Sequence, residues 1–104
     1  MTIKEIKEEL KEVKYYFSRK KVMDESIGSI GVGKDIMKLV QKYNKLAEKL
    51  PAHLYDVYYS LYVKNYKQET LALELSVSPN HICKRNLETL KEFKKMLDQG
   101  VING

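Results

Sequence analysis

Cysteine and histidine are scarce in this chain of 104 residues, and their scarcity limits the sites it can build. The single cysteine, Cys83, excludes an intrachain disulfide and a cysteine-based zinc site. The two histidines, His53 and His81, lie far apart in sequence, without acidic residues at metal-ligand spacing. We therefore expect no metal site.

Long apolar runs are also lacking. No run approaches the roughly 20 residues that cross a bilayer, and the first residues alternate lysine and glutamate where a signal peptide would be apolar. We expect a cytoplasmic protein without a membrane partner. The length supports one domain with a modest core.

Signals of catalysis are missing as well. No nucleophile accompanies a base, and no carboxylate pair is placed for acid–base chemistry. The segment from Gly28 to Asp35 approaches the phosphate-binding loop pattern, but Asp35 stands where that loop needs a hydroxyl to hold magnesium. No strand precedes the segment either. We interpret it as a linker and expect neither an enzyme nor a cofactor.

Positive charge is present in excess. The formal net charge is +5 and the pI is about 9.2, which fits a polyanion partner or a membrane surface. Residues 1–21 and residues 64–97 each hold seven basic and four acidic side chains, whereas residues 22–63 are balanced. The basic excess therefore gathers in two separate stretches.

Apolar residues at heptad spacing predict two amphipathic helices in the N-terminal half. The first, from about residue 3 to residue 23, carries the stripe Ile3, Ile6, Leu10, Val13 and Phe17. The second carries Ile36, Leu39, Tyr43, Leu46 and Leu50. The first stripe is short for an independent coiled coil, so it packs either on the second, as an antiparallel hairpin, or on another subunit. Intrachain packing and a homodimer through the N-terminal helices both stay open.

The stretch from Leu50 to Lys91 has the order of a helix-turn-helix. Small Ala72 suits the point where two helices cross, and a tight turn precedes Ser78, a good N-cap. Pro79 fits the first position of a helix, so the second helix is predicted to begin there. The apolar residues expected to pack this unit are Leu71, Leu75, Val77, Ile82, Leu87 and Leu90.

Tyrosines recur at steps of three and four residues on the helix that opens at Pro51: Tyr55, Tyr58, Tyr59 and Tyr62. This spacing predicts that one edge of the helix is core and that the hydroxyls reach its rim. Aromatic stripes also stack single-stranded bases. The helical spacing and the lack of a strand pattern favour the core.

The first two turns of the second helix carry side chains suited to a DNA groove. Asn80, His81 and Lys84 are expected to meet base edges, because asparagine pairs with adenine and lysine with guanine. Arg85 is expected to reach a base or a phosphate. The alternatives are a helical scaffold whose exposed face is merely basic and, for His81, a solvated side chain.

Phosphate contacts are expected at the helix starts. Lys67 and Gln68 open the first helix of the unit and Ser78 caps the second, where free backbone N–H groups favour anions. Lys91, followed by Lys94 and Lys95, adds weaker attraction to the DNA backbone. The candidate DNA-binding site thus comprises Lys67, Gln68, Ser78, Asn80, His81, Lys84, Arg85 and Lys91.

The stretch from Leu50 to Lys91 resembles the fourth conserved region of bacterial sigma factors and LuxR-type domains. The matching features are Leu50-Pro51, the Tyr62 to Tyr66 connector, Glu69, Leu71-Ala72, Leu75, Val77-Ser78, Ile82, Lys84-Arg85 and Leu90. Two positions depart from that pattern: Ser76 replaces the usual turn glycine, and Pro79-Asn80-His81 replaces charged base-reading residues. The resemblance therefore implies the scaffold and not the target sequence.

The segment from Gly31 to Met37, preceded by a charged helix, is similar to small regulators of Gram-positive phages and integrated elements, the ArpU/RinA type. This resemblance implies a regulator of late phage or mobile-element transcription. Double-stranded DNA is the expected partner, with RNA polymerase as a second. The rival is an adaptor with little DNA affinity that docks on RNA polymerase or a sigma factor, which the Glu/Lys-rich N-terminal helix favours.

The predicted fold class is all-α, with a long amphipathic N-terminal helix and a second helix before a sigma region-four-like helix-turn-helix. Residues 1–33 are expected to form the N-terminal helix and a Gly-rich linker. Residues 34–99 are expected to form the helical DNA-binding domain, with its helix-turn-helix at about 67–97, and residues 100–104 a frayed tail.

Overall fold

The computed structural model describes residues 1–25 and 34–100, and the side chains of 1–19 and 36–100. Every regular element in these residues is helical, which confirms the all-α prediction for that part of the chain. The elements are α1 (Ile3–Glu25), α2 (Lys34–Ala47), α3 (Ala52–Tyr58), the π-helical η1 (Tyr59–Val63), α4 (Gln68–Leu75) and α5 (Pro79–Asp98). The Gly-rich linker, residues 28–33, and the tail beyond Gly100 lie outside the described residues.

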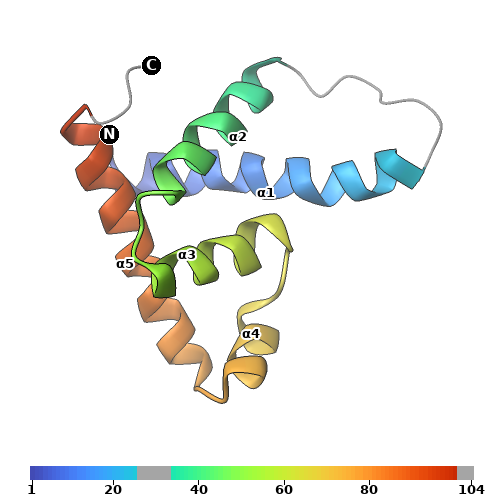
Figure 1. The fold of residues 1–104 in the computed structure, drawn as a ribbon, viewed down its shortest axis with the longest axis vertical. Coiled ribbons are helices and arrows are strands. Elements are labelled where there is room, and N and C mark those ends of the chain that lie inside the picture. The colour runs from blue at the N-terminus through green and yellow to red at the C-terminus, as the bar shows by residue number, and fades with distance from the viewer. Residues whose placement is uncertain (26–33, 101–104) are drawn as a thin grey trace.

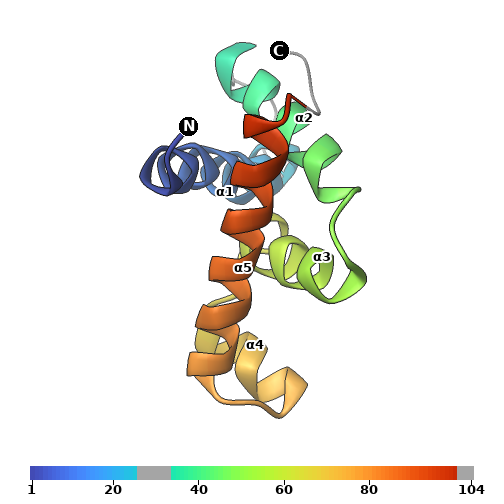
Figure 2. The same ribbon diagram turned by 90° about the vertical axis from the view of Figure 1, so that its left-hand side faces the viewer.

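α5 runs through the length of the molecule and contacts the other α-helices (Figure 1). Its C-terminal half lies beside α1 and α2, whereas α4 lies beside its N-terminal half at the opposite end (Figure 2). Phe93 of α5 is fully buried in a main core shared by α1, α2, α3 and α5. A second, smaller cluster joins α3, η1, α4 and the start of α5.

The stripe of α1 is buried within the chain. Ile6, Leu10 and Val13 are fully buried in the main core, and Ile3 and Phe17 pack at its edge. Each fully buried side chain of this kind stabilises a fold by about 1.5–3 kcal/mol. The N-terminal helix therefore shares its core with residues 34–99, and the predicted boundary at residue 33 separates no independent core.

α1 and α2 contact each other, but α2 crosses α1 obliquely rather than lying along it as an antiparallel hairpin (Figure 1). A polar cluster holds the crossing: the Tyr43 hydroxyl donates to Glu9 Oε1 at 2.6 Å, and Lys42 Nζ lies 3.0 Å from the same oxygen. Because the helices cross, α2 covers only part of the α1 stripe, and η1 and α5 cover the rest.

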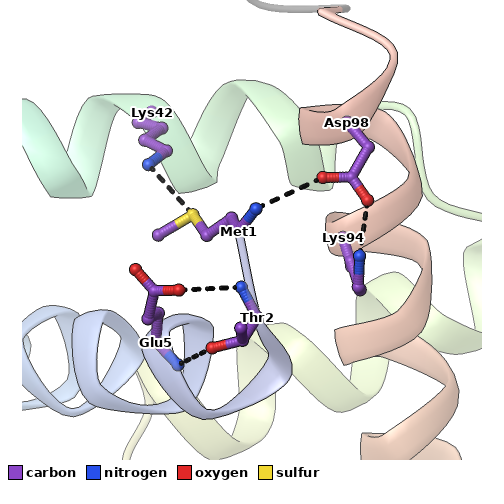
Figure 3. Close-up of polar contacts among 6 residues, drawn as sticks. All are labelled: Met1, Thr2, Glu5, Lys42, Lys94 and Asp98. Atoms are coloured by element: carbon purple, nitrogen blue, oxygen red, sulfur yellow. Dashed lines mark hydrogen bonds and ion pairs between the residues drawn. The ribbon is translucent and has the colours of Figure 1, made fainter.

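The start of α1 is fixed by its own side chains and by α5 (Figure 3). The Glu5 N–H donates to Thr2 Oγ1 at 3.1 Å while the Thr2 N–H donates to Glu5 Oε1 at 3.0 Å, a capping box that begins the helix at Ile3. The Met1 amino group lies 3.5 Å from the Asp98 carboxylate of α5. Asp98 also accepts from Lys94, and this hydrogen bond lowers the pKa of the Asp98 carboxyl.

The tyrosine stripe divides as its spacing predicts. Tyr58 is buried edge-on to Phe93, with ring centroids 5.6 Å apart, and Tyr62 lies half-buried beside it. Their hydroxyls donate to asparagine side chains at the rim of the core. Tyr55 and Tyr59 occupy the other edge and are exposed. The prediction of one core edge is confirmed.

Candidate nucleic-acid interface

The turn between α4 and α5 depends on one residue in a left-handed conformation. Ser76 has φ 56° and ψ 42°, where a side chain is strained and glycine is favoured. This conformation lets the Val77 N–H return to the Ala72 carbonyl at 2.9 Å, which closes the end of α4. The sequence predicts this strain, because Ser76 stands at the position that glycine usually occupies.

α5 begins at Pro79, as predicted. The Ser78 Oγ accepts the His81 N–H at 3.2 Å, and Pro79 occupies the first turn, where its missing N–H leaves no bond unmade. Capping uses the hydroxyl oxygen as an acceptor, so the Ser78 O–H stays able to donate to a phosphate. Its expected role is therefore compatible with its capping bond.

Leu71, Ala72 and Ile82 pack α4 on α5, and all three are buried. Ala72 lies at this contact, as its small size predicts. Val77 fills the side of the cluster. The same cluster includes Val57 and Leu61 of α3 and η1, so the helix-turn-helix unit is attached to the body of the molecule.

Two of the residues that were predicted to pack in this unit are exposed to solvent. Leu75 is 52% exposed, because it is the last residue of α4 and the chain turns at Ser76. Leu87 is 42% exposed, because it lies five positions after Ile82, and a step of five positions turns its side chain to the outer side of α5. Both predictions were wrong.

Thr89 occupies the buried position on α5 that the sequence assigned to a leucine. It is fully buried, and its hydroxyl donates to the Arg85 carbonyl at 2.9 Å. This bond to the preceding turn satisfies the hydroxyl without a partner from another helix. A search for apolar residues misses Thr89. Its spacing of seven residues from Ile82 was the available signal.

The outer face of α5 carries an exposed stripe at steps of four, three and four residues: Asn80, Lys84, Leu87 and Lys91. These positions fall on one side of a helix. We call them the outer stripe. It begins at the end of the molecule where α4 and the α4–α5 turn lie, away from α1 and α2 (Figures 1 and 2). Three of the predicted site residues are thereby brought together.

Arg85 and His81 lie at the edge of this stripe and are half-buried. The Arg85 Nε donates to His81 Nε2 at 3.4 Å, and its guanidinium forms an ion pair with Glu88 at 3.2 Å. Both side chains are therefore engaged within α5. Any contact with DNA by Arg85 has to use its remaining N–H groups.

Lys67 and Gln68 lie at the start of α4 and are exposed. Lys67 is the N-cap residue, and its side chain makes no capping hydrogen bond. The first backbone N–H groups of α4 thus lack the side-chain acceptor that Ser78 gives to α5. A phosphate oxygen is an acceptor of the right charge for this helix end.

The part of the chain that the structure describes contains no cluster of His, Cys, Asp and Glu that would hold a metal ion.

An open cleft of about 310 Å³ lies between α1, the end of α2, α3 and η1. Its walls are aromatic, and one carboxylate, that of Glu48, lines it. No cysteine, histidine or serine lines it. None of the described helices is both long and apolar enough to cross a membrane.

Comparison of the chain with protein-family models, with curated proteins and with solved structures found no match. No relative therefore transfers a site to these residues. The features of this chain that bear on its function are the geometry of α4, the turn and α5, and the charges that they expose.

Proposed function

We propose that this chain is a sequence-specific DNA-binding transcription regulator that places α5 in the major groove. The observation that carries this proposal is the outer stripe, an exposed amide and two exposed lysines on one side of a helix that α4 braces. The major groove admits an α-helix and displays a distinct donor and acceptor pattern for each base pair. Asn80 and Lys84 are the residues assigned to bases.

The residues assigned to phosphates lie at the starts of α4 and α5 and, in one case, further along α5. Lys67, Gln68 and the free N–H groups of α4 are assigned to one phosphate region, and the Ser78 hydroxyl and Lys91 to others. These contacts orient the protein on the duplex and give the complex its salt dependence. His81 and Arg85 are assigned to positioning, because their hydrogen bond and the Glu88 ion pair hold them against α5.

The resemblance of Leu50 to Lys91 to sigma-factor region four, and of the upstream segment to ArpU/RinA regulators, supports late phage or mobile-element genes as the targets. This assignment is tested by the genes that lie beside the coding sequence. Terminase and packaging genes downstream support it, and an unrelated metabolic operon contradicts it.

Selection of bound duplexes from a random library tests DNA binding without knowledge of the operator. The proposal predicts one enriched sequence, bound in gel shifts with an affinity that falls steeply between two salt concentrations. A set of bound duplexes without a consensus would indicate a merely basic scaffold. No binding at low salt would contradict DNA binding altogether.

One observation favours the rival function, an adaptor for RNA polymerase or a sigma factor. Leu73 of α4 is 81% exposed, and Leu75, the last residue of this helix, is exposed as well. Exposed leucines of this kind suit a protein surface better than a phosphate backbone. Retention of purified polymerase by the wild-type chain but not by Leu73→Ser, with no DNA binding by either, supports the adaptor.

A further inference from the structure

We propose that Leu87 reads thymine by contact with the C5-methyl group of that base. This inference rests on the proposed function, because it assumes that the outer stripe faces the major groove. It assigns a specificity-determining role to a residue that the sequence placed in the core. It also predicts a base preference that the polar residues of the stripe do not supply.

The position of Leu87 carries the inference. Its side chain is 42% exposed and belongs to neither apolar cluster of the described residues. It lies three residues after Lys84 and four before Lys91, and both lysines are exposed. The folded chain gains little from a leucine between two lysines in water, so its apolar surface is free to contact a ligand.

Helix geometry directs this side chain toward the base-reading end. Side chains on a helix lean toward its N-terminus, so Leu87 covers the surface over the turn that holds Lys84. The rise from Lys84 to Leu87 is about 4.5 Å along the axis, close to the roughly 3.4 Å between stacked base pairs. Leu87 is thus placed to meet a base pair next to the one that Lys84 contacts.

Thymine is the base whose groove edge matches an aliphatic side chain. Its C5-methyl group is the apolar feature of the major groove, whereas cytosine, adenine and guanine present polar atoms that leucine cannot satisfy. The lysines on either side favour a polyanion over an apolar protein groove, because burial of both ammonium groups against protein would need acidic partners.

Deoxyuridine provides a direct test, since it differs from thymidine at this edge only by the missing methyl group. In the selected duplex, each thymine is replaced in turn and the dissociation constants of wild type and Leu87→Ala are measured. One replacement is expected to weaken wild-type binding about fourfold, the effect of one buried methyl group. Leu87→Ala is expected to bind the thymine duplex more weakly and to be indifferent to that replacement.

Leu73→Ala is the matched control, because it removes an exposed leucine outside the outer stripe. This variant is expected to keep the wild-type response to deoxyuridine. A Leu87→Ala variant that retains that response, or a duplex in which no replacement matters, overturns the assignment of Leu87 while DNA binding stands. If the wild-type chain selects no DNA, the proposed function and this inference both fall.

Discussion

Tyr43 illustrates how single polar atoms are accommodated in the main core. Its ring is fully buried and its hydroxyl donates to Glu9. Burial is the main cause that raises the pKa of the Tyr43 hydroxyl well above its ordinary value, and the hydrogen bond to Glu9 and the negative charge of Glu9 raise it further. Burial raises the pKa values of Tyr58 and Tyr62 as well. The core therefore requires three neutral tyrosines.

This requirement predicts loss of stability in alkali. A tyrosine with a raised folded-state pKa contributes fully below its unfolded value of about 10, and the contribution disappears as the pH rises through the folded value. Unfolding by alkali, followed by circular dichroism, is expected to coincide with the appearance of tyrosinate absorbance from the buried residues. Ionisation of all tyrosines in a chain that stays folded would contradict the packing described above.

Tyr43→Phe separates the hydrogen bond from the ring. At neutral pH the free energy of unfolding is expected to fall by about 1 kcal/mol, the usual worth of one hydrogen bond. Above pH 10 the variant is expected to lose less stability than wild type, because one ionisable group is gone. Tyr15→Phe serves as the control, since Tyr15 is exposed on α1 and its hydroxyl is free of the core. An identical pH dependence of Tyr43→Phe and wild type would exclude the proposed role of burial.

At the scale of elements, the α4–α5 turn is the feature that sequence reasoning located best. Ser76, the Ser78 cap and the start at Pro79 are local features, set by backbone stereochemistry that a sequence displays directly. Leu75 and Leu87 were misplaced because burial depends on where another helix lies. The spacing of apolar residues shows which side of a helix is apolar. It does not show whether another helix covers a given residue on that side.

Substitution of Ser76 by glycine is expected to raise the free energy of unfolding by about 1 kcal/mol, because it removes a left-handed side chain. Ser18→Gly, in the exposed face of α1, is expected to lower it by about 0.5–1 kcal/mol, because glycine weakens an ordinary helix. Urea denaturation measures both. Equal signs for the two variants would show that Ser76 bears no strain.

The π-helical η1 was not predicted. The tyrosine and leucine spacing after Pro51 fits an ordinary helix, and one continuous α-helix was the natural reading. In the structure the Lys64 N–H bonds to the Tyr59 carbonyl at 2.9 Å, and Asn65 follows in the left-handed region with φ 61°. π-Helical turns are rare, and η1 packs against α1 and α4. Helix propensity along the sequence therefore does not predict it.

At the scale of the whole molecule, α1 is a structural part of the fold rather than an added arm. The apolar stripe of α1 does not distinguish packing within the chain from packing on a partner subunit, because both would bury the same residues. In the structure, α2, η1 and α5 of the same chain pack against the stripe. A homodimer stays a prediction and would need another surface.

Leu10→Ala tests this role of α1. Removal of a fully buried leucine is expected to lower the free energy of unfolding by about 2–5 kcal/mol, whereas Leu87→Ala is expected to change it by less than about 0.5 kcal/mol. The urea midpoint of each variant is expected to be independent of protein concentration. A midpoint that rises with concentration would place the α1 stripe in an interface between subunits.

The base-by-base specificity of Lys84→Ala tests the central claim, that the outer stripe of α5 reads DNA, most directly. Binding of the variant to the selected duplex and to its single-base changes is compared with wild type and with Lys45→Ala, an exposed lysine of α2. We predict that Lys84→Ala weakens binding by about 1–3 kcal/mol and loses discrimination at one position, while Lys45→Ala behaves as wild type. Wild-type affinity and discrimination in Lys84→Ala would contradict the account.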